Sequence, residues 1–159
     1  MNAKTEPLVQ QVGIVIVTHV DYGSSLLKAA EFIIGPVQDC VCIQVDAGLQ
    51  EVEETVARLK DAIRRLSSGN GVLILTDMFG GTPTNLSLSL LGTRTDVEVV
   101  TGVNLPMLLK VLVQRQQTLE ELSETAITAG IEGIIAAGKM LTSRVAAQNT
   151  KEQDPADKT

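Results

Sequence analysis

The only histidine of this sequence and one aspartate each follow a strand-like apolar run. His19 ends V-G-I-V-I-V-T-H, and Asp77 comes directly after V-L-I-L-T. A neutral imidazole can attack phosphorus with one ring nitrogen when an aligned carboxylate holds the proton on the other. We therefore predict phosphoryl transfer, with Nε2 of His19 as the nucleophile and Asp77 fixing the tautomer. On position alone Asp21 and Asp46, which also follow strand-like runs, compete for the second role.

The turn after Asp77, M-F-G-G-T-P-T-N, has the residue types of a phosphate site. Gly80 and Gly81 can adopt positive φ angles, so their backbone N–H groups can approach a ligand closely. Thr82 stands before Pro83 as an N-cap does, and a helix N-terminus attracts phosphate. Gly80, Gly81 and Thr82 are therefore the predicted phosphate-binding residues.

Each of these features also fits an ordinary structural role. A histidine at a strand end is often only hydrogen-bonded or solvated, and an aspartate there often caps a turn. The Gly-Gly turn matches neither the Walker sequence nor the G-x-G-x-x-G fingerprint, so by itself it also fits a plain loop. The neighbouring Met78 and Phe79 fit either a plug in the core or an exposed docking surface.

The elements that must position these residues alternate along the chain. Apolar runs predict strands at 12–19, 40–46, 72–76 and 97–101. Helical spacing predicts helices at 23–34, 49–66, 83–91 and 104–113, and a last helix from a Thr118/Glu121 capping box to a break or end near Gly130. This pattern predicts an α/β fold, a doubly wound parallel sheet between two layers of helices.

The order of the strands decides whether the candidate residues meet. In the order 2-1-3-4, counted along the chain, the first and third strands are neighbours. Their carboxyl ends then border the crevice in which ligands bind to such sheets. His19 and Asp77 would face each other there, a few ångströms apart.

Length and composition suit one soluble domain. The chain has 159 residues, of which 44% are hydrophobic and 20% charged. We predict a single domain at 12–144, between a flexible N-terminus at 1–11 and a disordered polar tail at 145–159. No apolar run reaches the roughly 18 residues of a membrane span, and the N-terminus lacks an apolar signal core. We therefore expect a cytoplasmic protein with no direct membrane insertion.

Charge and cysteine content argue against several kinds of ligand. A formal net charge of −6, one Tyr, two Phe and no Trp argue against nucleic acid, which requires basic surfaces and stacking rings. Cys40 and Cys42 are spaced neither as C-x-x-C nor as a zinc pair, so we expect small core residues on one face of a strand. Neither a metal nor a cofactor is expected.

Three blocks of the sequence resemble the IIA component of the mannose/fructose class of the sugar phosphotransferase system (PTS). They are I-V-I-V-T-H-V-D-Y-G-S-S-L-L-K-A-A-E-F-I-I-G, L-I-L-T-D-M-F-G-G-T-P-T-N and V-V-T-G-V-N-L-P-M-L. The middle block is similar to the family's aspartate followed by Gly-Gly-Ser/Thr-Pro-x-Asn, and the three blocks stand in the family's order. The resemblance covers about residues 12–140, nearly the whole predicted domain.

The resemblance implies a role for each matched residue. His19 matches the histidine that accepts phosphoryl from the phosphocarrier protein HPr and passes it to a IIB component. Asp77 matches the aspartate that hydrogen-bonds this ring, and Thr82 the hydroxyl residue at the phosphate site. The resemblance also implies the strand order 2-1-3-4 and a homodimer. In some members the dimer exchanges a C-terminal strand, which would add an antiparallel strand to the sheet.

One residue departs from the family pattern. Val20 stands where the residue after the histidine is commonly glycine. A β-branched side chain restricts the backbone. We expect Val20 to narrow access to the ring of His19 without preventing the chemistry.

Two other functions fit parts of the sequence. The phosphotransfer subunit of dihydroxyacetone kinases shares the fold and the histidine, but resembles D-M-G-S-A after the third strand, where this chain has D-M-F-G-G-T-P. A non-enzymatic flavodoxin-like module would use the turn only to hold an anion or a partner. Phosphorylation of His19 by the phosphorylated carrier protein separates transfer from binding.

Overall fold

The fold is organised around a four-stranded parallel sheet. The computed structural model describes residues 10–46, 49–67, 69–92 and 94–142. Within them the strands are β1 (Gly13–His19), β2 (Cys40–Val45), β3 (Val72–Thr76) and β4 (Val97–Thr101), in the order β2-β1-β3-β4. Neighbouring strands are parallel, and Val17 of β1 is in register with Thr76 of β3. The predicted strand order is therefore confirmed, with β1 and β3 at the centre.

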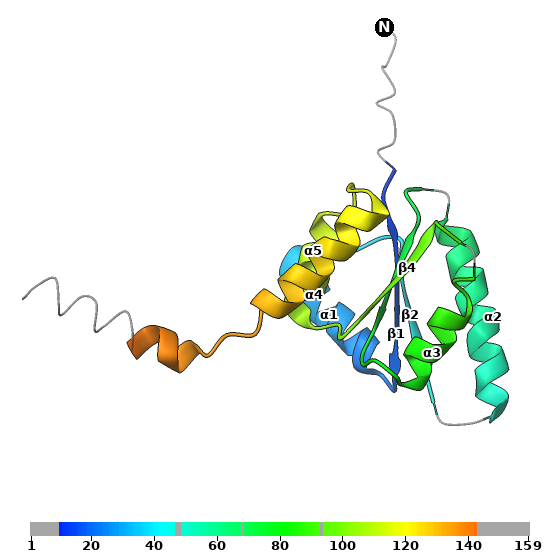
Figure 1. Cartoon of the computed structure of the whole chain (residues 1–159), viewed down its shortest axis with the longest axis horizontal. Helices are drawn as coiled ribbons and strands as arrows, with labels where there is room; N and C mark the ends of the chain where they lie inside the picture. Colours follow the sequence, from blue (N-terminus) through cyan, green and yellow to red (C-terminus); the bar gives the residue numbers. More distant parts are fainter. Residues whose placement is uncertain (1–9, 47–48, 68, 93, 143–159) are drawn as a thin grey trace, which may run out of the picture.

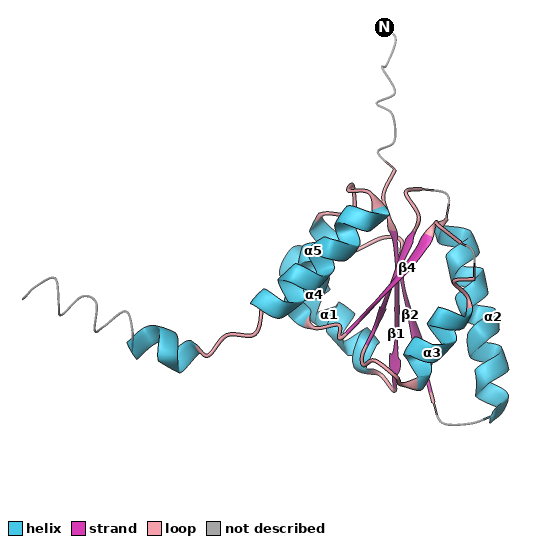
Figure 2. Ribbon diagram, viewed as in Figure 1, coloured by secondary structure: helices cyan, strands magenta, loops and turns pink. Residues whose placement is uncertain are grey.

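Helices cover both faces of the sheet, as Figures 1 and 2 show. One face carries α1 (Tyr22–Ile34), α4 (Leu105–Val113) and α5 (Leu119–Glu132), and the other carries α2 (Leu49–Leu66) and α3 (Thr82–Ser89). The side chains of β1 alternate between two cores: Ile14 and Ile16 pack with residues of α4 and α5, and Val15 and Val17 with residues of α2. Burial on both faces explains the unbroken apolar runs of the central strands.

The last helix starts at the predicted capping box. The Glu121 N–H donates to Thr118 Oγ1 (3.3 Å), and the Thr118 N–H donates to Glu121 Oε2 (3.0 Å). The helix ends at Glu132, close to the predicted end, but Gly130 lies inside it. A Cβ on Gly130 would lie 2.7 Å from Met107 Cε of α4. This glycine therefore permits close packing of two helices and does not end one.

No C-terminal strand is present among the described residues. Residues 137–142 are helical and extend away from the sheet (Figure 1), so the added antiparallel strand is not formed in this part of the chain. Within one chain this segment lies beside no strand edge, and its Ala, Lys, Met and Leu residues favour a helix. Residues 1–9 of the predicted flexible N-terminus, and the whole predicted polar tail, lie outside the described residues.

Both cysteines lie on the α1 face of β2, so they share one face of the strand as expected, but they are only partly buried. They are free thiols and pack against the same hydrophobic cluster. Burial raises the pKa of the Cys40 thiol to about 12 and that of Cys42 to about 11. At neutral pH both are therefore protonated, the weakly reactive form.

The described part of the chain contains no group of three or more His, Cys, Asp and Glu side chains arranged to hold a metal ion. None of its helices has both the length and the apolar character that crossing a membrane requires.

A buried arginine joins three segments at the amino edge of the sheet. Arg115, in the turn between α4 and α5, is 5% exposed. Its Nε donates to Val12 O (3.0 Å), its Nη1 donates to Gln38 O, and its Nη2 lies 4.0 Å from Asp39 Oδ2. The Arg115 carbonyl in turn accepts the Val12 N–H (2.8 Å). The start of β1, the turn before β2 and the turn before α5 are thereby held together.

Replacing this arginine should destabilise the protein. In Arg115→Met the carbonyls of Val12 and Gln38 lose a buried charged donor, and we expect the free energy of unfolding to fall by about 3 kcal/mol. Arg94→Met is the control, because Arg94 pairs with Asp96 at the surface (2.7 Å) and its loss should cost about 0.5 kcal/mol. Urea unfolding followed by circular dichroism measures both variants. Equal losses would contradict the role given to Arg115.

Candidate active site

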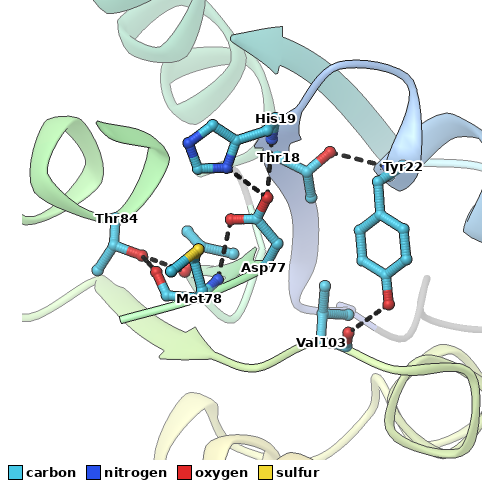
Figure 3. A network of polar contacts seen from close by, with 9 residues as sticks. Thr18, His19, Tyr22, Asp77, Met78, Thr84 and Val103 are labelled. Carbon is cyan, nitrogen blue, oxygen red and sulfur yellow. Dashed lines mark hydrogen bonds and ion pairs between the residues drawn. The ribbon is translucent and has the colours of Figure 1, made fainter. Parts of the chain in front are cut away.

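His19 and Asp77 meet at the carboxyl edge of the sheet (Figure 3). His19 is the last residue of β1, and Asp77 directly follows the neighbouring strand β3. His19 Nδ1 lies 2.7 Å from Asp77 Oδ2, and the same oxygen accepts the His19 backbone N–H at 2.8 Å. The side chain of His19 is 43% exposed and that of Asp77 is 15% exposed. The predicted proximity of the two residues is therefore confirmed.

The carboxylate decides which ring nitrogen carries the proton. Partial burial alone would raise the pKa of the Asp77 carboxyl, but hydrogen bonds from the His19 backbone, the His19 ring and the Met78 N–H outweigh burial and hold that pKa below its ordinary value. Asp77 is thus ionised at neutral pH and can only accept, so a neutral imidazole carries its proton on Nδ1. The lone pair is then on Nε2, away from Asp77. Such a nitrogen can act as a nucleophile.

The glycine-rich turn brings its backbone against the ring. A Cβ on Gly81 would lie 2.9 Å from His19 Cε1, so a side chain at position 81 would collide with the ring. Gly80 adopts a φ of +80°, which residues with a side chain rarely take. Thr82 is exposed at the N-terminus of α3. The predicted phosphate-binding turn therefore lies beside the ring, on the Cε1 side.

Thr82 is not the N-cap of α3, contrary to the prediction. Gly81 is the N-cap, with φ −74° and ψ 165°, and Thr82 is the first helical residue, which moves Pro83 to the second position. Proline is tolerated there because the N–H groups of the first turn have no partner inside the helix. The cap thus falls on the glycine that the ring approaches, and the partial positive charge of the helix N-terminus lies directly at the turn. The helix ends at Ser89, before the predicted end.

Two threonines support the turn, and the sequence reasoning missed them. Thr76 ends β3 and Thr84 lies in α3, with 0% and 1% exposure. Their hydroxyl oxygens are 2.7 Å apart, and Thr84 Oγ1 donates to Met78 O at 2.7 Å. On the other side of the site, Tyr22 OH donates to Val103 O (2.9 Å). The two threonines bracket the turn in the sequence, but neither residue type predicts such a contact by itself.

The other two candidate aspartates have different partners. Asp21 is the N-cap residue of α1 and accepts from Ser25 Oγ (3.3 Å). Asp46 accepts from Gln44 Nε2, at 3.1 and 3.0 Å. Both side chains are exposed. The alternatives left open by position are therefore decided by the fold in favour of Asp77.

Apolar side chains next to His19 and Asp77 are exposed to solvent. Val20 is 57% exposed, Met78 57% and Phe79 78%. Met78 and Phe79 are therefore not a plug in the core. We call these three side chains the apolar rim of the site.

Comparison with known proteins gives the family. The model of the family described as PTS system fructose IIA component (EIIA-man) matches residues 13–127. The chain belongs to this family. The resemblance found in the sequence is confirmed, and the dihydroxyacetone kinase subunit and the binding module are not favoured.

The relatives of this chain differ in how much of their own sequence aligns with it. The mannose-specific EIIAB component of Escherichia coli K12 is 32% identical over 125 residues, which are 77% of this chain and 38% of that protein. The fructose-specific EIIA component of Bacillus subtilis is 29% identical over 107 residues, 66% of this chain and 71% of that protein. The chain thus spans well under half of the E. coli protein.

A solved IIA structure has the same fold. The crystal structure of EIIA from Streptococcus agalactiae superposes with a TM-score of 0.72 at 30% identity, covering 80% of this chain and 98% of that chain. The mannose/sorbose-specific IIA subunit from Enterococcus faecalis gives a TM-score of 0.67 at 25% identity. The α/β sheet described above is therefore the fold of IIA components.

Val20 has a backbone conformation that suits the glycine expected there in a IIA component. Its φ is +45°, although it carries a β-branched side chain. A residue with a Cβ is strained in this left-handed region by roughly 1–2 kcal/mol. The Val20 N–H donates to Val45 O (3.4 Å), so the backbone is tied to β2 despite the strain. The strain lies directly beside the candidate nucleophile.

Replacing Val20 by glycine should stabilise this IIA domain. The variant loses the strain but gains chain entropy when unfolded, so we expect the free energy of unfolding to rise by about 0.5–1 kcal/mol. Val113→Gly is the control: Val113 is 60% exposed at the end of α4 and has no positive φ, so glycine there relieves no strain and should not raise stability. Urea unfolding measures both variants. A loss of stability in Val20→Gly would contradict the strain assigned to Val20.

Proposed function

We propose that this chain is a phosphoryl carrier of the PTS, in which His19 accepts a phosphoryl group from phosphorylated HPr and passes it to a IIB component. The observation that carries the proposal is the 2.7 Å contact between His19 Nδ1 and Asp77 Oδ2, in a ring that is 43% exposed. This contact leaves Nε2 as the nucleophile of a phosphohistidine intermediate, where a partner can reach it. Membership of the IIA family supports the same role.

Asp77 would keep the proton on Nδ1 of His19 and balance the charge of the intermediate. As the bond from phosphorus to Nε2 forms, the bond from phosphorus to the donor histidine breaks, and the donor nitrogen keeps the electron pair. Nδ1 keeps its proton throughout, so the phosphorylated ring is positively charged. The ionised Asp77, 2.7 Å from Nδ1, offsets this charge. Transfer to the IIB component repeats the same bond changes with a new acceptor.

Gly80, Gly81 and Thr82 would bind the phosphoryl oxygens. The turn lies against His19 Cε1, the ring atom next to Nε2, and α3 begins within it. Backbone N–H groups at a helix N-terminus and the exposed Thr82 hydroxyl can donate to the equatorial oxygens of a transferring phosphoryl group. Most of the catalysis would come from such positioning and charge stabilisation.

The apolar rim supports a protein as the reaction partner. Its three side chains, of which Phe79 is the most exposed at 78%, directly follow His19 and Asp77 in the chain. Exposed apolar groups that cluster on a soluble domain often mark an interaction site. HPr and the IIB component would dock here in turn, in the cytoplasm.

Incubation of the chain with phosphorylated HPr tests this function. We expect a mass gain of one phosphoryl group, labile to acid and stable to alkali, and no gain in His19→Ala. In Asp77→Asn the amide no longer enforces the Nδ1–H tautomer, so the acceptance rate should fall by about 10²-fold or more. Asp46→Asn is the control and should react like the unmodified chain, since Asp46 bonds Gln44 at the surface.

Two results would count against the proposal. If the unmodified chain gains no phosphoryl group, the carrier function is wrong. If Asp77→Asn reacts as fast as the unmodified chain, the role of the carboxylate is wrong.

We also infer a homodimer that forms through the C-terminal part of α5 and the residues after it. The exposed apolar side chains of this segment are Ile127, Ile131, Ile134, Ile135, Met140 and Leu141. Three of them line a pocket of about 290 Å³ in which the buried Thr101 hydroxyl has no partner among the described residues. An apolar surface of this kind marks an interaction site, and the family resemblance implies a second copy as the occupant.

Analytical ultracentrifugation tests the dimer. The chain has a mass of 16.9 kDa, and we expect a species of twice that mass. Ile134→Glu places a charge in the apolar surface and should give the monomer, because burying an unpaired carboxylate is costly. Phe32→Glu is the control: Phe32 is 93% exposed on α1, outside this surface, and its variant should stay dimeric. A monomeric unmodified chain would refute the inference.

A further inference from the structure

Two buried hydroxyls hold the turn beside His19 through one carbonyl. Thr84 Oγ1 donates to Met78 O at 2.7 Å (Figure 3). Thr76 Oγ1 lies 2.7 Å from Thr84 Oγ1. A hydroxyl has one proton, and a carbonyl can only accept. Because Thr84 donates its only hydroxyl proton to Met78 O, the hydrogen bond between the two hydroxyls must be donated by Thr76. The chain of donation therefore runs from Thr76 through Thr84 to the Met78 carbonyl.

The residue that receives this bond also orients Asp77. The Met78 N–H donates to Asp77 Oδ1 at 2.9 Å, which leaves Oδ2 for the backbone and ring of His19. The Met78 carbonyl also accepts the Gly81 N–H at 3.4 Å, and Gly81 lies against His19 Cε1. Met78 thus contacts the groups on both sides of the ring. Its N–H binds the carboxylate that lies at Nδ1, and its carbonyl binds the glycine that lies at Cε1.

Burial makes this pair of hydroxyls important to the turn. Thr76 and Thr84 are 0% and 1% exposed, so water has little access to replace a lost hydroxyl between them and Met78. A hydrogen bond shielded from water is also electrostatically stronger than an exposed one. Thr84 occupies the position that the pattern Gly-Gly-Ser/Thr-Pro-x-Asn leaves open, so the family pattern gives it no role.

We propose that Thr84, supported by Thr76, is a positioning residue for His19. Its hydroxyl holds the Met78 carbonyl and thereby the backbone conformation of Met78, which aims the Met78 N–H at the Asp77 carboxylate. The carboxylate in turn fixes the Nδ1–H tautomer and the orientation of the ring. The kinetic consequence rests on the proposed function, whereas the effect on the ring does not. Without the Thr84 hydroxyl the backbone torsions of Met78 are no longer held, the Met78 N–H can turn away from Asp77 Oδ1, and the carboxylate can turn away from Nδ1.

The tautomer of His19 can be observed without any phosphoryl donor. His19 is the only histidine of the chain, so ¹⁵N labelling of histidine gives one pair of ring nitrogen signals. We expect the Nδ1–H tautomer in the unmodified chain and in Thr84→Ser. Thr84→Val, which has the same shape but no hydroxyl, should show a mixture of tautomers. Thr76→Val removes only the supporting hydroxyl and should show a smaller change in the same direction.

Ser87→Ala is the matched control for losing a buried hydroxyl in α3. Ser87 is 0% exposed, and its Oγ donates to Pro83 O at 2.7 Å instead of to the turn. Its loss should lower stability and leave the tautomer unchanged. Thermal unfolding of each variant, followed by circular dichroism, shows that it is folded at the temperature of the measurement.

The rate of phosphorylation by phosphorylated HPr is the second readout. We expect Thr84→Val to react about tenfold more slowly, with Thr84→Ser and Ser87→Ala within about twofold of the unmodified chain. An unchanged tautomer and rate in folded Thr84→Val would overturn the positioning role. If Thr84→Val does not fold, Thr76→Val decides by the same two readouts. No phosphorylation of the unmodified chain, together with mixed tautomers in Thr84→Val, would refute the carrier function and support the positioning of the ring.

Discussion

The hydrogen bond between His19 Nδ1 and Asp77 is the interaction on which the site depends, and it exists only because β1 and β3 are neighbours. The two residues are 58 positions apart in the sequence. The parallel register sets Val17 beside Thr76, the last residue of β3, so Asp77 follows β3 where β1 reaches its last two residues, Thr18 and His19. One carboxylate oxygen then accepts both the backbone N–H and the ring of His19, which holds a half-exposed side chain in a single orientation.

The central strands are rigid along their buried length, and the site at their carboxyl ends is accessible to solvent. The central strands are buried on both faces up to Thr18 and Thr76, so the sheet cannot shift easily beneath the site. Arg115 fastens the opposite edge, where it joins the start of β1 to two turns. Within β1 and β3 only His19, the last residue of β1, is partly open to solvent, and the turn after β3 is exposed at Met78 and Phe79. Rigid strands that carry an exposed imidazole suit His19, because its ring must be reached by partner proteins and must also keep its tautomer.

Two backbone positions next to His19, Gly81 and Val20, meet strict steric limits in different ways. Gly81 has no side chain, and this allows the turn to approach the ring. Val20 has a β-branched side chain and still adopts φ +45°, because the chain must turn sharply from β1 into α1. The close approach at Gly81 causes no backbone strain, whereas the positive φ of Val20 does. Strain retained beside a reacting group is a common feature of functional sites.

Much of this protein follows from local sequence patterns. Apolar runs and helical spacing determine the elements and their alternation, and the motif around Asp77 indicates the chemistry, since both depend on residues close together in the chain. Local pattern could not choose Asp77 over Asp21 and Asp46, place the N-cap on Gly81, or join Thr76 to Thr84 through Met78. Those outcomes depend on which strands are neighbours and on how α3 returns over the sheet. Contacts between distant residues are set by the packing of whole elements, so only the tertiary structure decided them.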